Sequence, residues 1–392
     1  MVIYNAFRVA IFVFAFLACV AGAQAQVFST KADFAILIDV TSGATLYEKN
    51  SSKRMEPASM AKMMTLAVVF DALKKGQLRL HDTMQVSVDA WKRGGTQSGG
   101  STMFLDPNPK VAPPTVEDLI RGVAIQSGND ACIVLAEGMA GTEEAFADRM
   151  NSLAKRIGMR DSNFTTSTGL PDENQYTTAY DLAVLGRYLI EEFPDLYAIF
   201  QEPEFTWNKI RQFNRNPLLK SKIGGDGIKT GFTRKSGFGM VGAAAQEDRR
   251  LLMVVNGLKT RRIRSEESER LLQWGFRSFQ SIPLFGKGEV IGNAKVFGGE
   301  KSSVELIAKR RIALLLPKGD FGRISAKVLY KGPLSAPVEA GTSVGQLVIK
   351  VDGEQVQSEP VFANEDVAEG TLQQRAYDAL WELTAGWLGS KL

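Results

Sequence analysis

The sequence predicts an α/β protein: a domain of helices packed on an antiparallel sheet, followed by a small all-β domain and a C-terminal amphipathic helix. The first observation is a strand-like hairpin near the N-terminus, followed by a stretch in which apolar residues recur at helical spacing. The second is a return to strand patterns after Gly224, which would place these strands in one sheet with the hairpin. The third is a run of short alternating strands from about residue 281. The 392 residues suffice for two or three domains.

Residues 1–25 have the features of an export signal that is removed from the mature chain. Arg8 is the only charged residue before Lys31, residues 9–20 form an apolar core, and Ala23-Gln24-Ala25 is a small-residue cleavage site. The apolar core is too short to span a bilayer comfortably. We therefore expect a periplasmic protein. ATP and nicotinamide cofactors are scarce there, which favours hydrolysis or group transfer without a diffusible cofactor.

The counts of cysteine, histidine and charge exclude several classes of protein. Two cysteines and one histidine cannot assemble a structural zinc site. Cys19 would leave with the signal, so Cys132 has no disulfide partner within the mature chain. His81 lies in a polar turn, where histidines are usually solvated, so a serine enzyme would more readily use lysine as its base. The net charge of +4 is spread along the chain and does not indicate nucleic acid as a partner.

The predicted hairpin consists of residues 35–40 and 44–47, and a buried helix follows it. Apolar residues recur there at helical spacing as far as Gly76, a C-terminal stop. Ser59 falls in the first turn of this helix and Lys62 lies one turn later on the same face. The pair can be a nucleophile and its base, although an N-cap serine with a solvated lysine is the commoner explanation.

A second Ser-x-x-Lys pair shows that spacing alone cannot identify a nucleophile. Ser152 and Lys155 have the same separation, but they lie well inside a helix predicted over residues 142–157. Other observations have to decide between the two pairs.

The middle of the chain is predicted to be mostly helical. The Gly- and Ser-rich segment 94–101 is expected to be a flexible loop, and it lacks the spacing of a phosphate-binding loop. Helical patterns follow from Thr115, over 142–157 and over 178–189. The turn-like Ser127-Gly128-Asn129 interrupts the first of them.

Strands return after Gly224 and complete the first domain, which we assign to residues 26–280. They are antiparallel in the prediction, because short turns separate them. The strands are expected over residues 227–233, 237–245 and 251–257, and the helix that follows them over 265–276.

Residues 281–369 are predicted to form a separate all-β domain, a sandwich by the spacing of its strands. The strands are short and often alternate apolar with polar residues, and turns with Gly and Lys separate them. No group of residues in this domain indicates chemistry. The strands are expected over residues 289–297, 303–308, 312–317, 324–330, 345–351 and 356–361.

Residues 370–392 are predicted to form an amphipathic helix. Leu372, Leu380 and Trp387 lie on one apolar stripe, and charged residues take the opposite side. A stripe with tryptophan suits a helix that lies in the interface of the inner membrane, held by apolar burial because few cations are present. The alternative is a terminal helix docked on the β domain.

Three short motifs stand in order along the chain: Ser59-Met60-Ala61-Lys62, Ser127-Gly128-Asn129 and Lys229-Thr230-Gly231. Each is weak alone, but together, tens of residues apart and behind an export signal, they are specific. With them the chain resembles the low-molecular-mass penicillin-binding proteins of the D-alanyl-D-alanine carboxypeptidase type, over nearly everything after the signal. The resemblance implies a penicillin-binding/β-lactamase-like transpeptidase domain. It extends to the stretches 56–59, 126–131, 227–233 and 271–276 and to the β domain and terminal helix.

The resemblance also implies a role for each motif residue. Ser59 would be the acylated nucleophile, Lys62 the base for its proton, and Ser127 the group that passes a proton to the leaving amine. Asn129 would bind the substrate amide and orient Lys62. Backbone N–H groups of Ser59 and Phe232 would form the oxyanion hole.

The strand Lys229-Thr230-Gly231 would align the peptide by strand addition. Lys229, Thr230 and Arg264 would hold the terminal carboxylate, although an exposed basic cluster of Arg264 with its neighbours is the alternative. Lys62 must be neutral to act as a base, and the ordinary pKa of lysine is about 10.4. We expect burial and the like charge of Lys229 to lower the pKa of Lys62.

The expected function is therefore that of a serine carboxypeptidase that trims the terminal D-alanine from peptidoglycan pentapeptide. It would be acylated by β-lactams and would need no metal or cofactor. A D,D-endopeptidase, a weak β-lactamase and a catalytically silent wall-binding scaffold are the alternatives. Class A β-lactamases have Asp at the position of Gly128, and Glu173 is the loop acid that could stand for their deacylating Glu.

Overall fold

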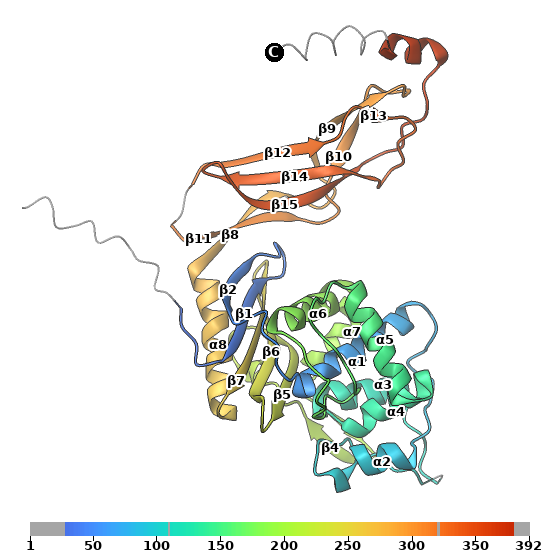
Figure 1. Cartoon of the computed structure of the whole chain (residues 1–392), viewed down its shortest axis with the longest axis vertical. Coiled ribbons are helices and arrows are strands. Elements are labelled where there is room, and N and C mark those ends of the chain that lie inside the picture. Colours follow the sequence, from blue (N-terminus) through green and yellow to red (C-terminus); the bar gives the residue numbers. More distant parts are fainter. Residues whose placement is uncertain (1–27, 109, 320–321, 380–392) are drawn as a thin grey trace, which may run out of the picture.

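The computed structural model describes residues 28–108, 110–319 and 322–379, so the predicted signal and the end of the tail lie outside the described residues (Figure 1). A five-stranded sheet organises the first domain, in the order β2-β1-β7-β6-β5. Every neighbouring pair in it is antiparallel, as predicted. Its strands are β1 (Phe34–Asp39), β2 (Thr45–Lys49), β5 (Gly225–Thr233), β6 (Gly237–Gln246) and β7 (Arg249–Leu258).

Helices cover both faces of this sheet, which makes the domain three layers thick (Figure 1). Ile36 and Val254 belong to a core shared with the central helices, whereas Leu37 and Val255 belong to a core shared with the long helix α8. Successive residues of a strand point to opposite faces, so both faces are apolar. The strands therefore read as nearly continuous hydrophobic runs.

Three of the central helices begin where the sequence supplies a capping threonine. Thr115 forms a capping box with Asp118, and the side chains of Thr142 and Thr178 each accept a hydrogen bond from the third residue of the helix that follows. The helices are α1 (Lys62–Lys74), α3 (Val116–Arg121), α4 (Asn129–Ala140), α5 (Glu143–Arg156), α6 (Ala179–Glu192) and α7 (Pro194–Tyr197).

Several elements of this domain differ from the prediction. The expected loop 94–101 includes the end of α2 (Val88–Gly94), which Ser87 caps, and a 3-10 turn (Thr96–Ser98). The short hairpin of β3 (Glu204–Trp207) and β4 (Ile210–Phe213) was not predicted, because four-residue strands show too little alternation.

Helix α8 (Arg261–Ser278) begins four residues before the predicted start at residue 265. Its first turn is basic, so the apolar periodicity that identifies a helix is missing there. The start is fixed by Thr260, whose side chain accepts a hydrogen bond from Ile263 N. This earlier start places Arg264 on a helix.

The second domain is all-β, as predicted, and it follows α8 without a loop, because β8 begins at Phe279. A six-stranded sheet in the order β12-β14-β15-β10-β9-β13 packs with the pair β11-β8 around an apolar core. Neither β8 nor β13 was predicted. The strands are β8 (Phe279–Phe285), β9 (Val290–Phe297), β10 (Ser303–Ile307), β11 (Ile312–Pro317), β12 (Ile324–Tyr330), β13 (Leu334–Ser335), β14 (Ser343–Val351) and β15 (Glu354–Ala363).

The described part of the tail is helical over residues 372–379. Its polar side meets the β domain, where Gly298 N donates a hydrogen bond to Asp378 Oδ2 at 2.9 Å. Leu372 and Tyr377 are exposed. Within the described ranges, the structure contains no helix both long and apolar enough to span a bilayer.

Candidate active site

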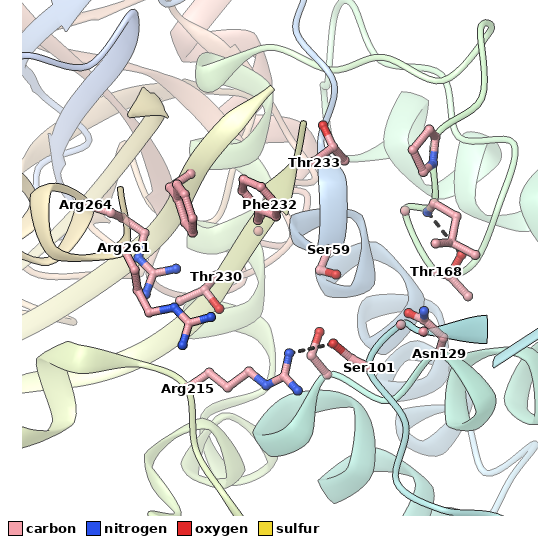
Figure 2. A pocket seen from close by; sticks show the side chains of 18 of the residues that line it. Ser59, Ser101, Asn129, Thr168, Arg215, Thr230, Phe232, Thr233, Arg261 and Arg264 are labelled. Carbon is pink, nitrogen blue, oxygen red and sulfur yellow. Dashed lines mark hydrogen bonds between the residues drawn. The ribbon is translucent and has the colours of Figure 1, made fainter. Parts of the chain in front are cut away.

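A cavity of about 790 Å³ lies where the central helices meet strand β5. Figure 2 shows Ser59 between Thr230 and Phe232 on one side and Thr168 and Asn129 on the other. All three predicted motifs contribute to its lining. The residues that line it are Ser59, Gly99, Gly100, Ser101, Ser127, Asn129, Thr168, Gly169, Leu170, Pro171, Phe213, Asn214, Arg215, Thr230, Gly231, Phe232, Thr233, Phe238, Arg261 and Arg264.

Ser59 stands on a 3-10 turn, η1 (Ala58–Ala61), that leads directly into α1. The neighbours of Ser59 in the turn are buried, and Ala58 adopts a left-handed backbone conformation with φ of 48°. Ser59 itself is only partly buried and reaches the cavity. The predicted place of Ser59 at a helix start is confirmed.

The Lys62 amine, with 0% of the residue exposed, has three neighbours within hydrogen-bond distance. They are Ser59 Oγ at 3.1 Å, Asn129 Oδ1 at 2.7 Å and the Thr168 carbonyl at 2.5 Å. A neutral amine has two hydrogens and one lone pair. Because the amide and carbonyl oxygens only accept, they take both hydrogens, and the lone pair is left for the Ser59 hydroxyl. The geometry thus suits Lys62 as a base.

Burial, helped by the nearby guanidinium of Arg215, lowers the pKa of Lys62 to about 8. Nearby Cys132, Asp130 and Glu143 oppose this shift. The main cause is therefore desolvation of the ammonium form. The like charge that contributes most is Arg215, and Lys229, which the sequence suggested, is not among the main causes. Burial also lowers the pKa of Lys229 well below its usual range, with repulsion from Lys62 as the second cause.

The Ser127-Gly128-Asn129 motif forms a sharp corner between two helices. A π-helical turn (Gly122–Gln126) ends at Ser127, whose φ of 67° is left-handed, and α4 begins at Asn129. The Ser127 hydroxyl is buried and has no partner among the described residues. A strained residue with an unused hydroxyl in the lining of the same cavity as Ser59 is typical of a functional position.

Asp130 anchors this corner to the loop that lines the cavity. Its carboxylate, fully buried, accepts hydrogen bonds from Thr102 Oγ1 at 2.6 Å and from the backbone N–H groups of Met103 at 2.9 Å and Leu105 at 3.0 Å. Asn129 N donates to the Ser101 carbonyl at 2.7 Å. The sequence analysis did not single out Asp130 or this loop.

Strand β5 forms the opposite wall of the cavity. Lys229 is 2% exposed, and its amine donates only to the Thr230 carbonyl, at 3.3 Å, among the described residues. At Gly231 a Cβ atom would lie 3.2 Å from the Pro57 carbonyl, so a glycine lets η1 approach the strand closely. The Phe232 ring is half exposed and stacks on Phe238, with centroids 4.2 Å apart.

Arg264 is buried in the cavity wall and is only 5% exposed, which rejects the alternative of an exposed basic cluster for this residue. Its Nε has no partner within the described chain. Burial, with Arg261 as the second cause, lowers the pKa of Arg264 to about 10. Arg261 also lines the cavity, whereas Arg262 is exposed and pairs with Glu266.

Arg215 is a further cation of the cavity, and sequence reasoning missed it. Figure 2 shows Arg215 pointing to Ser101, whose hydroxyl accepts a hydrogen bond from Nη1 at 2.5 Å. The segment around Arg215 is irregular and carries no motif, so no sequence signal distinguished it. Of the described residues that line the cavity, none is acidic.

The other candidates from the sequence lie elsewhere. Ser152 and Lys155 are both exposed on α5, and neither lines this cavity. His81 and Glu173 are exposed and are also absent from the lining. Cys132 is free and buried, and burial raises the pKa of its thiol to about 12.

This fold, with a serine hydroxyl beside a buried lysine amine, defines a serine peptidase of the penicillin-binding type. The chain belongs to the D-alanyl-D-alanine carboxypeptidase family: the model of that family matches residues 20–260. The model of the C-terminal domain of penicillin-binding protein 5 matches residues 279–369. The resemblance inferred from the motifs is thereby confirmed.

Individual relatives are similar over almost their full length. The D-alanyl-D-alanine carboxypeptidase DacC of Escherichia coli is 42% identical over 358 residues, which cover 91% of this chain and 89% of DacC. DacA of Haemophilus influenzae is 39% identical over 348 residues, covering 88% and 87%. The crystal structure of penicillin-binding protein 5 from Haemophilus influenzae superposes with a TM-score of 0.78 at 38% identity, covering 87% of this chain and 99% of that one.

Proposed function

We propose that this protein is a serine-type carboxypeptidase that removes the terminal D-alanine from the pentapeptide of peptidoglycan through an acyl-enzyme on Ser59. The observation that supports the role of Ser59 most directly is the Lys62 amine, which is buried and held by two acceptors so that its lone pair faces the hydroxyl. Membership of the carboxypeptidase family supports the choice of reaction.

In the first half of the reaction, Ser59 Oγ attacks the carbonyl of the penultimate D-alanine while its proton moves to Lys62. The oxyanion then accepts hydrogen bonds from the backbone N–H groups of Ser59 and Phe232, each worth a few kcal/mol in such sites. As the peptide bond breaks, the leaving amine takes a proton. We assign the relay of this proton from Lys62 to Ser127, whose buried hydroxyl has no partner among the described residues.

In the second half, water attacks the ester carbonyl. Lys62, neutral again, takes a proton from the water, and Ser59 Oγ leaves with a proton returned by the amine. The shortened peptide is released and the free enzyme is restored.

The cations of the cavity favour a carboxypeptidase over an endopeptidase. Lys229 and Arg264 are buried, and neither forms an ion pair with a described carboxylate. Buried charges without a partner are stabilised by a bound anion. The C-terminal carboxylate of a peptide supplies this anion, beside the Thr230 hydroxyl. An internal peptide bond with no free carboxylate beside it would leave these charges unpaired.

The same arrangement supports acylation by β-lactams, whose ring carbonyl and carboxylate resemble those of the peptide end. Penicillin-binding protein D2 of Listeria monocytogenes, 28% identical with a TM-score of 0.56 and covering 64% of this chain, has been solved in an ampicillin-bound form. A cefotaxime-bound form is also known. The described lining holds no acid that could activate water as in a β-lactamase, so we expect the drug ester to persist.

Two measurements test this function. Ser59→Ala should abolish covalent labelling by a fluorescent penicillin, and persistent labelling would refute Ser59 as the nucleophile. Release of D-alanine from diacetyl-Lys-D-Ala-D-Ala should be observed for the unaltered protein. Binding of this peptide without release of D-alanine would instead favour the wall-binding scaffold.

We also propose that the protein is exported and attaches to the inner membrane through residues 370–392. In the described part of the tail, Asp378 and Arg375 are among the residues that make polar contacts, the latter with Glu369 at 2.9 Å, while Leu372 and Tyr377 are exposed. An apolar side that is free of the β domain favours the membrane over docking. Deleting the residues after Gly370 should release the protein from membranes, and a truncated protein that still sediments with them would refute the anchor.

A further inference from the structure

The two donors of the oxyanion hole come from elements far apart in the chain. Ser59 N–H belongs to η1 and Phe232 N–H to β5, so their separation depends on how η1 packs against the strand. An oxyanion hole works only when both donors lie within hydrogen-bond distance of one oxygen atom. The contact between η1 and β5 is therefore part of the site.

Much of the strand surface that contacts η1 lacks side chains. Cβ atoms built on Gly231 and Gly239 would lie 3.1 Å from Met60 Cγ and 2.8 Å from Met60 Cε, so the two strands present bare backbone to η1. Close packing of this kind limits how near the elements come. It does little to fix the position of η1 along β5, because the two glycines have no side chains to hold Met60 in one place along the strand.

A polar contact at the end of β5 restrains the position of η1 along the strand, which the glycine surface does not do. Thr233 Oγ1 donates a hydrogen bond to Glu56 Oε2 at 2.9 Å and accepts one from Ser236 N at 2.9 Å. Glu56 is only three residues before Ser59, and Thr233 directly follows Phe232. One hydrogen bond thus joins the neighbours of the two oxyanion donors across 177 positions of the chain.

Glu56 is held on its other sides as well. Its side chain is 15% exposed and pairs with Lys235 Nζ at 2.9 Å, and its carbonyl accepts a hydrogen bond from Asn256 Nδ2 at 3.4 Å. Lys235 is 82% exposed, so this ion pair contributes little by itself. The shielded bond to Thr233 is the stronger restraint.

We propose that Glu56 and Thr233 form a clamp that holds the two N–H groups of the oxyanion hole at their working separation. Glu56 is a positioning residue, because it does not line the cavity and acts through Ser59 and Phe232. The inference rests on the proposed acyl transfer by Ser59. It assigns a task to the acidic residue of the Glu56-Pro57-Ala58-Ser59 stretch that the roles above leave unused.

The test compares Glu56→Ala, which removes the acceptor, with Glu56→Gln, which keeps an acceptor oxygen for Thr233. We expect Glu56→Ala to lower kcat for diacetyl-Lys-D-Ala-D-Ala about tenfold with little change in KM, because the hole acts mainly in the transition state. The carbonyl stretching band of the penicilloyl ester should move to higher wavenumber, since a weaker hole polarises the carbonyl less. Glu56→Gln should resemble the unaltered protein in both measurements.

Two further variants keep the result decisive. Lys235→Ala removes the ion pair and leaves the clamp, so it should change neither kcat nor the carbonyl band. If Glu56→Ala does not fold, Thr233→Val and Thr233→Ser provide the same comparison. A normal carbonyl band in Glu56→Ala or Thr233→Val, or equal losses in Glu56→Gln and Glu56→Ala, would overturn the clamp. Failure of the unaltered protein to be acylated would instead overturn the proposed function.

Discussion

The pH dependence of acylation gives a direct test of the site, because the active form of Lys62 is the neutral one. Burial lowers the pKa of Lys62 to about 8. Since the pKa is lowered, the neutral amine is present above about pH 8 and is lost as the pH falls through that value. We therefore expect the acylation rate to fall about tenfold per pH unit below pH 8 and to level off above about pH 9.

The size of the effect follows from the same pKa. At pH 7, a lysine with a pKa of about 8 is neutral in about one molecule in ten, whereas a lysine with a pKa of 10.5 is neutral in about one in three thousand. Removing the amine from water therefore supplies about 300-fold more active base at neutral pH. This gain is of the size that enzymes obtain by tuning a catalytic lysine.

The assay is the second-order rate constant for acylation by a chromogenic cephalosporin between pH 5.5 and 10, with stability checked at each pH. If the acylation rate fell around pH 10 instead of pH 8, the argument from burial would be refuted. A fall around pH 6 would point to another titrating group. Lys229→Ala provides the second arm. If the Lys229 charge helps to lower the pKa of Lys62, its removal should move the acidic side of the pH–rate profile to higher pH. An unchanged profile would leave burial and Arg215 as the causes of the lowered pKa.

Two further substitutions test the supports of the site. Asp130→Asn would turn an NH2 group toward buried donors whichever way the amide lies. We therefore expect unfolding in denaturant to show a free energy of unfolding lower by about 1–3 kcal/mol, and KM to rise because the loop is released. Unchanged stability would contradict the anchor role. Gly169→Ala places a Cβ atom 1.9 Å from the Ala58 carbonyl at a φ of 75°, so it should lower the melting temperature and slow acylation by displacing the adjacent Thr168 carbonyl from Lys62. A variant with native melting and acylation would show that this loop can shift without affecting the base.

Much of the fold followed from periodicity, because the elements that carry it are long and buried. The helices after Thr142 and Thr178 have both an apolar face and a capping threonine, and each was predicted to within a few residues. Elements without these signals were missed. The hairpin β3–β4 is too short to alternate, and the first turn of α8 is basic and has no apolar face.

The candidate site was predicted unevenly for a similar reason. Ser59, Lys62 and Asn129 belong to motifs whose spacing is visible in the chain, and the structure brings them together. Arg215 and Asp130 have no such spacing. Their relation to the site depends on tertiary contacts, which a single sequence does not contain.

The unpaired cations have a consequence for the stability of the enzyme when no substrate is bound. Lys62, Lys229 and Arg264 are buried, and both Lys62 and Arg264 lower the pKa of Lys229. No carboxylate lines the adjacent cavity among the described residues. Buried like charges destabilise the folded state, so the free enzyme should be less stable than the enzyme with a ligand bound in this cavity. A peptide end or a β-lactam that enters this cavity supplies the missing negative charge. Its arrival should raise the melting temperature, and simple carboxylates that are not substrates should raise it too.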